Sequence, residues 1–480
     1  MLQLAPEKMR ELAHHVVEVL IERSVRLPDE RAWEGDFKDA LAHQLDEDPP
    51  EIGRSARTVI DRAVQTVLNN TLRLDHPRSF GFVPSCPTWP GVLADFMASG
   101  FNVNAVNWLV ASGPSQLEEV VINWFRQWFG LPEGAGGLMT SGGSAAALHA
   151  FVAAREAAGN PERPVTYMSD QSHSSQVRAA RIVGIMQDGI RLLPTDASGR
   201  IDPGEVAEAI AADRSAGYTP MVVCANAGTA TGGAVDPLPA LANICDAERV
   251  WFHIDAAYGG FSILTPRGAA ALRGIDRADS ISTDPHKWLF QPYEAGCILV
   301  RDVGALERAF SMQHDVLQDS VWGAKHANMA DYGLQLSRSF RALKIWMSIQ
   351  TFGMAAFRAA IENGLDLAAR AADYARESRT LEFVSESLGI VCFRANPGGV
   401  GEDVLASMNR KVLARMFWGG QSFLSSTVVN RRVVLRLCIV NHNTTWDDVR
   451  ETLRAVERFA IEVNEEHRHD RDDLRSPVRG

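Results

Sequence analysis

The chain has 480 residues, of which 46% are hydrophobic and 22% charged, as in an ordinary globular protein with a large core. Its formal net charge of −11 argues against a nucleic-acid binder and against a protein drawn to anionic membranes. We find no apolar run of roughly 18 residues, no secretory signal and no metal-binding spacing among the six scattered cysteines. These features predict a cytoplasmic protein with reduced thiols, no membrane span and no metal site.

The first part of the chain is mostly helical in pattern. Residues 7–24 place apolar side chains three or four positions apart, which predicts an amphipathic helix, and residues 54–73 are also typical of a helix. Residues 76–91 are dense in Pro, Gly and aromatic residues, which indicates an irregular loop. We therefore expect residues 1–85 to form a helical N-terminal arm that ends in a loop on the substrate side.

The pattern changes from residue 86 to residue 350. Short apolar runs such as "TPMVVCANA" and "RVWFHIDA" alternate with helical segments, which predicts an α/β domain around a largely parallel sheet. Residues 351–465 combine a long helical pattern, two strand-like runs and a last helix near 446–463, as expected of a smaller α+β domain. Residues 466–480 are predicted to be a charged, solvated tail.

Lys287 lies in the segment "STDPHKWLF", between a proline and histidine on one side and large apolar residues on the other. A crowded lysine loses its proton more readily than a free one, and a neutral amine is a nucleophile. The more ordinary interpretation is a packed stem whose charged end reaches water. The segment alone leaves both interpretations open.

Four other segments carry groups that suit a bound ligand. Asp255 ends an apolar run, where open α/β sheets place their ligands. Gly143 and Ser144 lie between an apolar run and an alanine-rich helix, an outline that suits an anion. His173 in "SDQSHSS" has only small neighbours, and Thr229 lies in a glycine-rich loop. Each segment taken alone is also compatible with a cap, a turn or a surface side chain.

Taken together, these groups suit one cofactor, pyridoxal 5′-phosphate (PLP). Its aldehyde needs a lysine, and its pyridine nitrogen needs a carboxylate partner. Its phosphate needs backbone N–H groups, and its ring needs a partner on each face. Neither GxGxxG nor GxxxxGK[ST] occurs at the glycine-rich turn, which disfavours a dinucleotide or nucleoside triphosphate.

Over residues 76–440 the chain resembles the group II PLP-dependent amino-acid decarboxylases, the family of aromatic-L-amino-acid, histidine and glutamate decarboxylases. "DPHKW" is similar to the family's "NPHKW", "HIDAAYGG" to "HVDAAYAG", "SDQSHSS" to "SDQAHSS", and "SRSFRALKIW" to "GRRFRSLKMW". The resemblance implies the fold-type I architecture of PLP enzymes. That architecture has a large α/β domain with a mostly parallel seven-stranded sheet flanked by helices, and a small C-terminal α+β domain.

The resemblance also implies roles for individual residues. Lys287 corresponds to the Schiff-base lysine, His286 to its neighbour near the phosphate, and Asp255 to the partner of the pyridine nitrogen. His173 corresponds to the imidazole stacked over the cofactor ring, and Ala257 to a small contact under it. The further positions are Gly143 and Ser144 in the phosphate turn, Thr229 as a cofactor contact, and Phe82, Pro84 and Ser85 near the substrate.

The implied activity is that of a carboxy-lyase of amino-acid metabolism, which converts an L-amino acid to its amine and carbon dioxide. Phe82 and Trp89 favour an aromatic or bulky substrate. The family assembles its sites at a homodimer interface, so we expect a homodimer. Other fold-type I chemistry (an aldehyde synthase, a carbon–carbon lyase or an aminotransferase) and a non-catalytic paralogue remain as alternatives.

The sequence departs from the family at two places. Asp284 stands where the family often has Asn, and an anion would repel the phosphate there, so Asp284 is left outside the expected site. The loop at 319–340 places Met329 where aromatic-amino-acid decarboxylases carry a tyrosine that protonates the substrate carbon. We name Tyr332 as the candidate catalytic acid, with His326 as the alternative.

Overall fold

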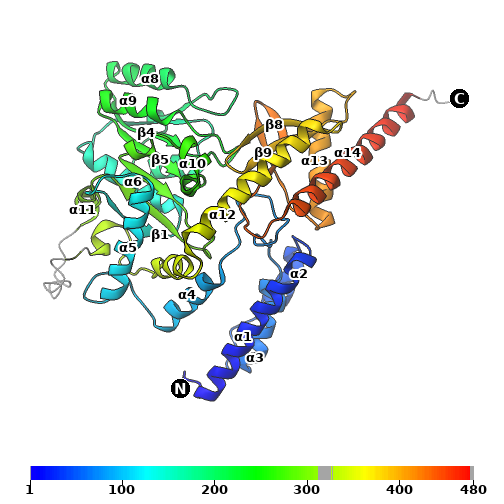
Figure 1. Cartoon of the computed structure of the whole chain (residues 1–480), viewed down its shortest axis with the longest axis horizontal. Helices are drawn as coiled ribbons and strands as arrows, with labels where there is room; N and C mark the ends of the chain where they lie inside the picture. The colour runs from blue at the N-terminus through cyan, green and yellow to red at the C-terminus, as the bar shows by residue number, and fades with distance from the viewer. Residues whose placement is uncertain (1, 312–325, 327, 476–480) are drawn as a thin grey trace.

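A seven-stranded sheet forms the centre of the large domain in this computed structural model, which describes residues 2–311, 326 and 328–475 (Figure 1). The strand order is β1-β7-β6-β5-β4-β2-β3, with parallel pairing from β6 to β3 and β7 antiparallel to both of its neighbours. The predicted mostly parallel seven-stranded sheet is confirmed. Its strands are β1 Gly136–Thr140, β2 Pro164–Ser169, β3 Ile190–Leu193, β4 Thr219–Asn226, β5 Trp251–Ala256, β6 Ser280–Thr283 and β7 Gly296–Val300.

Helices cover both faces of this sheet because the buried strands are apolar on both sides. Val223 and Ala225 of β4 belong to the cluster that contains α8 and α9, whereas Val222 and Cys224 belong to the one that contains α6 and α7. Successive strand residues point to opposite faces, so the two clusters form two layers. The helices of this domain are α4 Trp89–Gly100, α5 Ser112–Trp128, α6 Gly143–Ala157, α7 Ser174–Ile182, α8 Pro203–Ser215, α9 Leu238–Glu248, α10 Pro266–Ala271 and α11 Gly304–Phe310.

The C-terminal part is built on an antiparallel sheet of four strands in the order β10-β11-β9-β8. It is reached through α12, which bends at Gly353, where φ is 70°, a conformation that favours glycine. The predicted domain boundary at 350/351 lies just before this bend and stays a prediction. The elements are α12 Ala342–Glu377, β8 Leu381–Ser387, β9 Ile390–Ala395, α13 Glu402–Gly419, β10 Ser425–Val429, β11 Arg432–Cys438 and α14 Trp446–Arg475.

The last helix is longer than expected. We expect a helix near 446–463, but α14 continues to Arg475. Arg415 of α13 forms ion pairs with Glu462 and Glu466, at N–O distances of 3.2 and 2.5 Å, the second of them beyond residue 463. None of the helices in the described ranges has both the length and the apolar character needed to span a bilayer.

The N-terminal arm extends away from the two sheets (Figure 1). It consists of α1 Pro6–Arg26, α2 Lys38–Leu45 and α3 Ala56–Arg62, which is followed by a π-helical stretch, Ala63–Leu68. The helix predicted at 7–24 is therefore present, and the one predicted at 54–73 is present but shorter.

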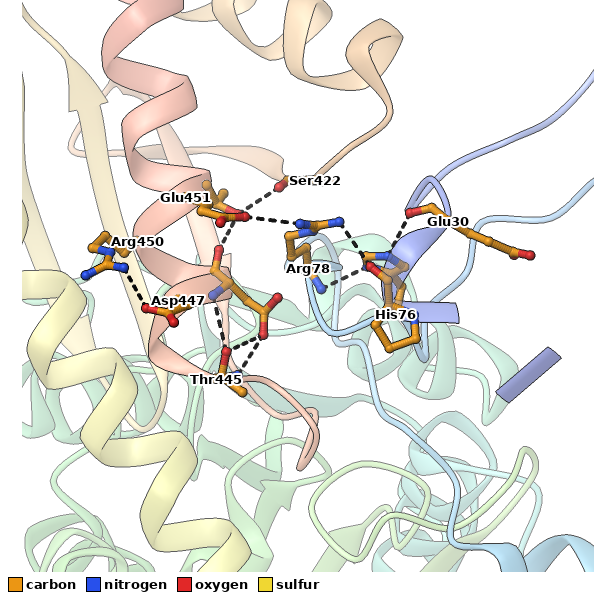
Figure 2. A network of polar contacts seen from close by, with 11 residues as sticks. Glu30, His76, Arg78, Ser422, Thr445, Asp447, Arg450 and Glu451 are labelled. Atoms are coloured by element: carbon orange, nitrogen blue, oxygen red, sulfur yellow. Dashed lines mark hydrogen bonds and ion pairs between the residues drawn. The ribbon is translucent and has the colours of Figure 1, made fainter. Parts of the chain in front are cut away.

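A polar junction joins the arm to the C-terminal helix (Figure 2). The backbone N–H of Arg78 donates to His76 Nδ1 at 2.9 Å, so His76 Nε2 is the donor to the carbonyl oxygen of Glu30 at 3.1 Å. The Arg78 guanidinium pairs with Glu451 of α14 at 3.1 Å. Burial, followed by the charge of Arg78, lowers the pKa of His76 to about 4, so this imidazole is neutral at pH 7.

Candidate active site

A cavity of about 300 Å³ opens where β1, β4, β5 and β6 end. The carboxyl ends of these strands lie at one edge of the sheet, the usual position of ligand sites in such folds. The predicted residues found in its lining are Gly143, Ser144, His173, Asp255, Ala257, His286 and Lys287. The lining also contains Asp284, which the expected repulsion of the phosphate places outside the site.

Lys287 is held in place by the turn that follows β6. Its backbone N–H donates to the carbonyl oxygen of Asp284 at 3.0 Å, and Ser85 Oγ donates to the carbonyl oxygen of Lys287 at 2.9 Å. Trp288, Leu289 and Phe290 are all buried, so the apolar neighbours anchor the backbone and leave the amine free to enter the cavity.

The Lys287 amine pairs with Asp284, whose Oδ2 lies 2.9 Å from Nζ. Burial alone would lower the pKa of the lysine, but the charge of Asp284 and its hydrogen bond outweigh burial, and the pKa is raised. Asp284 therefore favours the charged amine.

Asp255 lies at the end of β5 and accepts three hydrogen bonds. Gln176 Nε2 donates to Oδ2 at 2.8 Å, while Ser282 Oγ and the backbone N–H of Ala257 donate to Oδ1 at 3.2 and 3.1 Å. Both carboxylate oxygens are thus oriented by fixed donors. Gln176 and Ser282 are not among the predicted site residues, although Gln176 follows His173 by three positions and shares the first turn of α7.

The turn between β1 and α6 is suited to an anion. No side chain in the described part of the chain caps α6, so the N–H groups of its first turn lie free at the cavity. A Cβ on Gly143 would lie 2.8 Å from the Cβ of Ala257 and 3.2 Å from Asp284 Oδ2. Glycine is therefore required for this close approach, and the helix dipole favours negative charge there.

His173 and His286 complete the polar lining. His173 is the N-cap of α7 and accepts from the backbone N–H of Ser175 at its Nδ1, which leaves Nε2 as the protonated nitrogen. Burial lowers the pKa of His286, although Asp284 lies 3.5 Å away and opposes that shift.

Several predicted residues lie outside the lining found in the described part of the chain. Thr229 Oγ1 accepts from the backbone N–H groups of Gly232 and Ala234 and so builds its own loop, while Gly228 and Ala230 reach the cavity. The other predicted residues outside the lining are Phe82, which is exposed, Pro84 and Ser85, which are buried, and Tyr332.

Tyr332 ends a short 3₁₀ helix, Met329–Tyr332, which lies against α11. Its side chain packs against the apolar cluster that contains Ala305 and Leu306 of α11, and burial, together with nearby acidic groups, raises its pKa. Residues 319–325 and 327 of the predicted catalytic loop lie outside the described residues. His326 stacks on Trp108, with 3.8 Å between ring centroids.

The lining fits PLP. It offers an amine, a fixed carboxylate, free N–H groups at a helix start whose glycine admits no Cβ, and an imidazole from a third element. These are the groups that its aldehyde, pyridine nitrogen, phosphate and ring require. Fold and cavity together define a fold-type I PLP enzyme.

Comparisons with known proteins agree. The model of the pyridoxal-dependent decarboxylase conserved domain matches residues 39–396. The aromatic-L-amino-acid decarboxylase of Bacillus atrophaeus is 39% identical over 96% of this chain and 98% of its own. The phenylacetaldehyde synthase of Arabidopsis thaliana is 28% identical over 95% of this chain and 96% of its own. The crystal structure of Oryza sativa TDC with PLP and tryptamine has a TM-score of 0.92 at 27% identity, covering 96% of this chain and 99% of that one.

The chain therefore belongs to the pyridoxal-dependent decarboxylase family, and its cofactor is PLP. The predicted family, enzyme class and cofactor are confirmed.

Proposed function

We propose that this enzyme decarboxylates an aromatic L-amino acid to the corresponding amine and carbon dioxide. The observation that carries the proposal is the convergence of Lys287, Asp255 and the start of α6 on one cavity. The aromatic substrate is supported by the Bacillus atrophaeus relative, an aromatic-L-amino-acid decarboxylase, and by the aromatic residues Phe82 and Trp89 near the predicted substrate side.

Each polar group of the cavity has a part in this reaction. Bound PLP supplies a conjugated ring that takes up the electron pair left when carbon dioxide departs. Lys287 would hold the cofactor through its aldehyde and would give place to the substrate amine. Asp255, oriented by its three donors, would be the partner of the pyridine nitrogen. Gly143 and Ser144 would offer backbone N–H groups to the phosphate, and His173 would lie against the ring.

A proton must return to the substrate Cα after carbon dioxide leaves. We propose Tyr332 as the donor, with His326 as the alternative, in both cases acting on the cavity of a partner subunit. Within one chain Tyr332 packs against α11, away from the lining that the described residues form. A donor supplied by a second chain is consistent with this position.

A second candidate is oxidative formation of an aldehyde. The residue that aligns with the family's loop tyrosine is Met329, and its side chain is buried and has no proton to donate. The Arabidopsis thaliana relative is a phenylacetaldehyde synthase. In that reaction dioxygen is the oxidant: amino acid, dioxygen and water give aldehyde, carbon dioxide, ammonia and hydrogen peroxide.

We infer that the enzyme is a homodimer. Apolar side chains lie exposed on the projecting arm, on α4 and on the segment after α4, where a single chain leaves them in water. A second copy would cover both surfaces. Those side chains are Met9, Ile21, Val25, Val59, Phe96, Phe101, Leu109 and Val110.

We also infer a cytoplasmic location. All six cysteines are buried as free thiols, as expected in a reducing compartment.

The decisive experiment is a panel of L-amino acids assayed for carbon dioxide, amine, aldehyde and peroxide. Amine and carbon dioxide in equal amounts from an aromatic substrate would support decarboxylation, whereas aldehyde with peroxide would favour the second candidate. Lys287→Ala should abolish all products, and Lys411→Ala, a change at an exposed lysine of α13, is the matched control. Full activity in Lys287→Ala would rule out the assignment.

A further inference from the structure

Asp284 lies close to both the Lys287 amine and the His286 imidazole. Its Oδ2 lies 2.9 Å from the Lys287 amine and 3.5 Å from His286 Nε2. Its side chain is buried, and among the described residues no donor satisfies Oδ1. A buried carboxylate with one unsatisfied oxygen is costly, so its ion pair with Lys287 matters for this group.

The same carboxylate lies against the turn that begins α6. An ideal Cβ on Gly143 would be 3.2 Å from Asp284 Oδ2, and one on Gly142 would be 3.8 Å from Oδ1. The free N–H groups of this turn are those suited to an anion, and Asp284 already brings a negative charge to them.

We propose that Asp284 competes with the cofactor, pairing with the Lys287 amine and placing a negative charge beside the phosphate turn, and so promotes cofactor release. The inference rests on the proposed function because it requires Lys287 to be the lysine joined to PLP. In this proposal Asp284 is a positioning residue, because it acts on the cofactor through Lys287.

The hydrolysis that frees the cofactor from Lys287 supports the proposal that Asp284 promotes release. Release adds one water across the carbon–nitrogen double bond that joins the cofactor to Lys287, restores the aldehyde and returns the amine. Hydrolysis of a neutral linkage leaves a neutral amine, which takes one proton from solvent and gains Asp284 as its partner. Asp284 thus stabilises the released side of the equilibrium and repels the phosphate on the bound side, and both effects favour release.

The raised pKa of Lys287 agrees with this competition. Burial pushes that pKa down, and Asp284 is the first cause that pushes it up. A neutral residue at 284 would remove this stabilisation of the charged amine.

The test measures cofactor release from purified holoenzyme. The protein is diluted into buffer with an agent that traps free PLP, and loss of the visible absorbance of the bound cofactor is followed in time. Asp284→Asn removes the charge at almost constant shape, Asp284→Ser removes it in a smaller side chain, and Asp302→Asn changes an exposed carboxylate as the control. We expect release to be about tenfold slower in both neutral variants and unchanged in the control. A tenfold change in this rate corresponds to about 1.4 kcal/mol.

Release from both neutral variants as fast as, or faster than, release from the wild type would overturn the inference. Using two variants guards against one of them failing to fold. A wild-type protein that carries no cofactor would instead count against the proposed function, so the two failures are distinguishable.

Discussion

The polar side chain at the end of β5 and the one at the end of the segment Met329–Tyr332 lie in opposite environments. At the strand end, both oxygens of Asp255 are bonded to donors from other elements, and its direction into the cavity is fixed. The hydroxyl-bearing ring of Tyr332 packs beside apolar residues of α11, outside the lining that the described residues form. The difference teaches that the described lining contains Lys287 and Asp255 but not Tyr332, so the proposed proton donor lies apart from the groups that would hold the cofactor.

The largest loss of activity should come from a substitution of Asp255, at the end of β5. Asp255→Asn keeps the shape but removes the charge opposite the pyridine nitrogen, so we expect decarboxylation to fall about 10²–10³-fold, the loss typical of a fixed electrostatic group. The rate of carbon dioxide release measures it, with Asp302→Asn as the control. A loss smaller than threefold in a cofactor-loaded variant would contradict the role of Asp255.

The segment that ends at Tyr332 gives the next test. Tyr332→Phe removes one hydroxyl, and if that hydroxyl returns the proton, amine formation should fall about 10²-fold, with a larger share of aldehyde and peroxide. Product analysis by chromatography separates these outcomes. Amine production equal to the wild type would remove Tyr332 as the donor and leave His326.

A smaller effect should come from the donors that orient Asp255. Gln176→Leu removes the donor to Oδ2, and we expect about tenfold lower activity and a shifted cofactor spectrum, the cost of one hydrogen bond to a charged group. The stability of the fold should also fall, because the buried carboxylate of Asp255 loses a donor. Gln187→Leu, a change at an exposed residue, is the control. An unchanged cofactor spectrum in Gln176→Leu would contradict the role proposed for Gln176.

The last test concerns the arm junction (Figure 2), which should affect the stability of the fold and leave activity near pH 7 unchanged. The pKa of His76 is about 4 in the folded chain and ordinarily near 6.5. As pH falls through this range the unfolded chain binds a proton that the folded chain does not, so the free energy of unfolding decreases, by up to about 3 kcal/mol. Urea unfolding between about pH 7 and about pH 4 checks it. His76→Gln should show a shallower dependence on pH, and an identical slope would contradict this.

The parts of the site that could be predicted are carried by contiguous motifs. Lys287, Asp255 and the Gly143-Ser144 turn each follow an apolar strand pattern, and parallel strands end at one edge of the sheet. The fold class follows from the same alternation of strands and helices.

The missed parts depend on contacts between distant segments. Gln176 meets Asp255 across 79 positions, and no local pattern indicates that contact. The sequence places Asp284 outside the expected site because an isolated carboxylate repels phosphate. In the structure that carboxylate pairs with the Lys287 amine. In the extension of α14, Glu466 pairs with Arg415 of another helix, a contact that no local pattern indicates.

The most direct test of the central claim is to reduce the holoenzyme with borohydride and map the modified peptide by mass spectrometry. Reduction fixes the cofactor to the lysine that carries it. We predict a phosphopyridoxyl group on Lys287 alone. A label on another lysine, or no label in protein that contains the cofactor, would contradict the account.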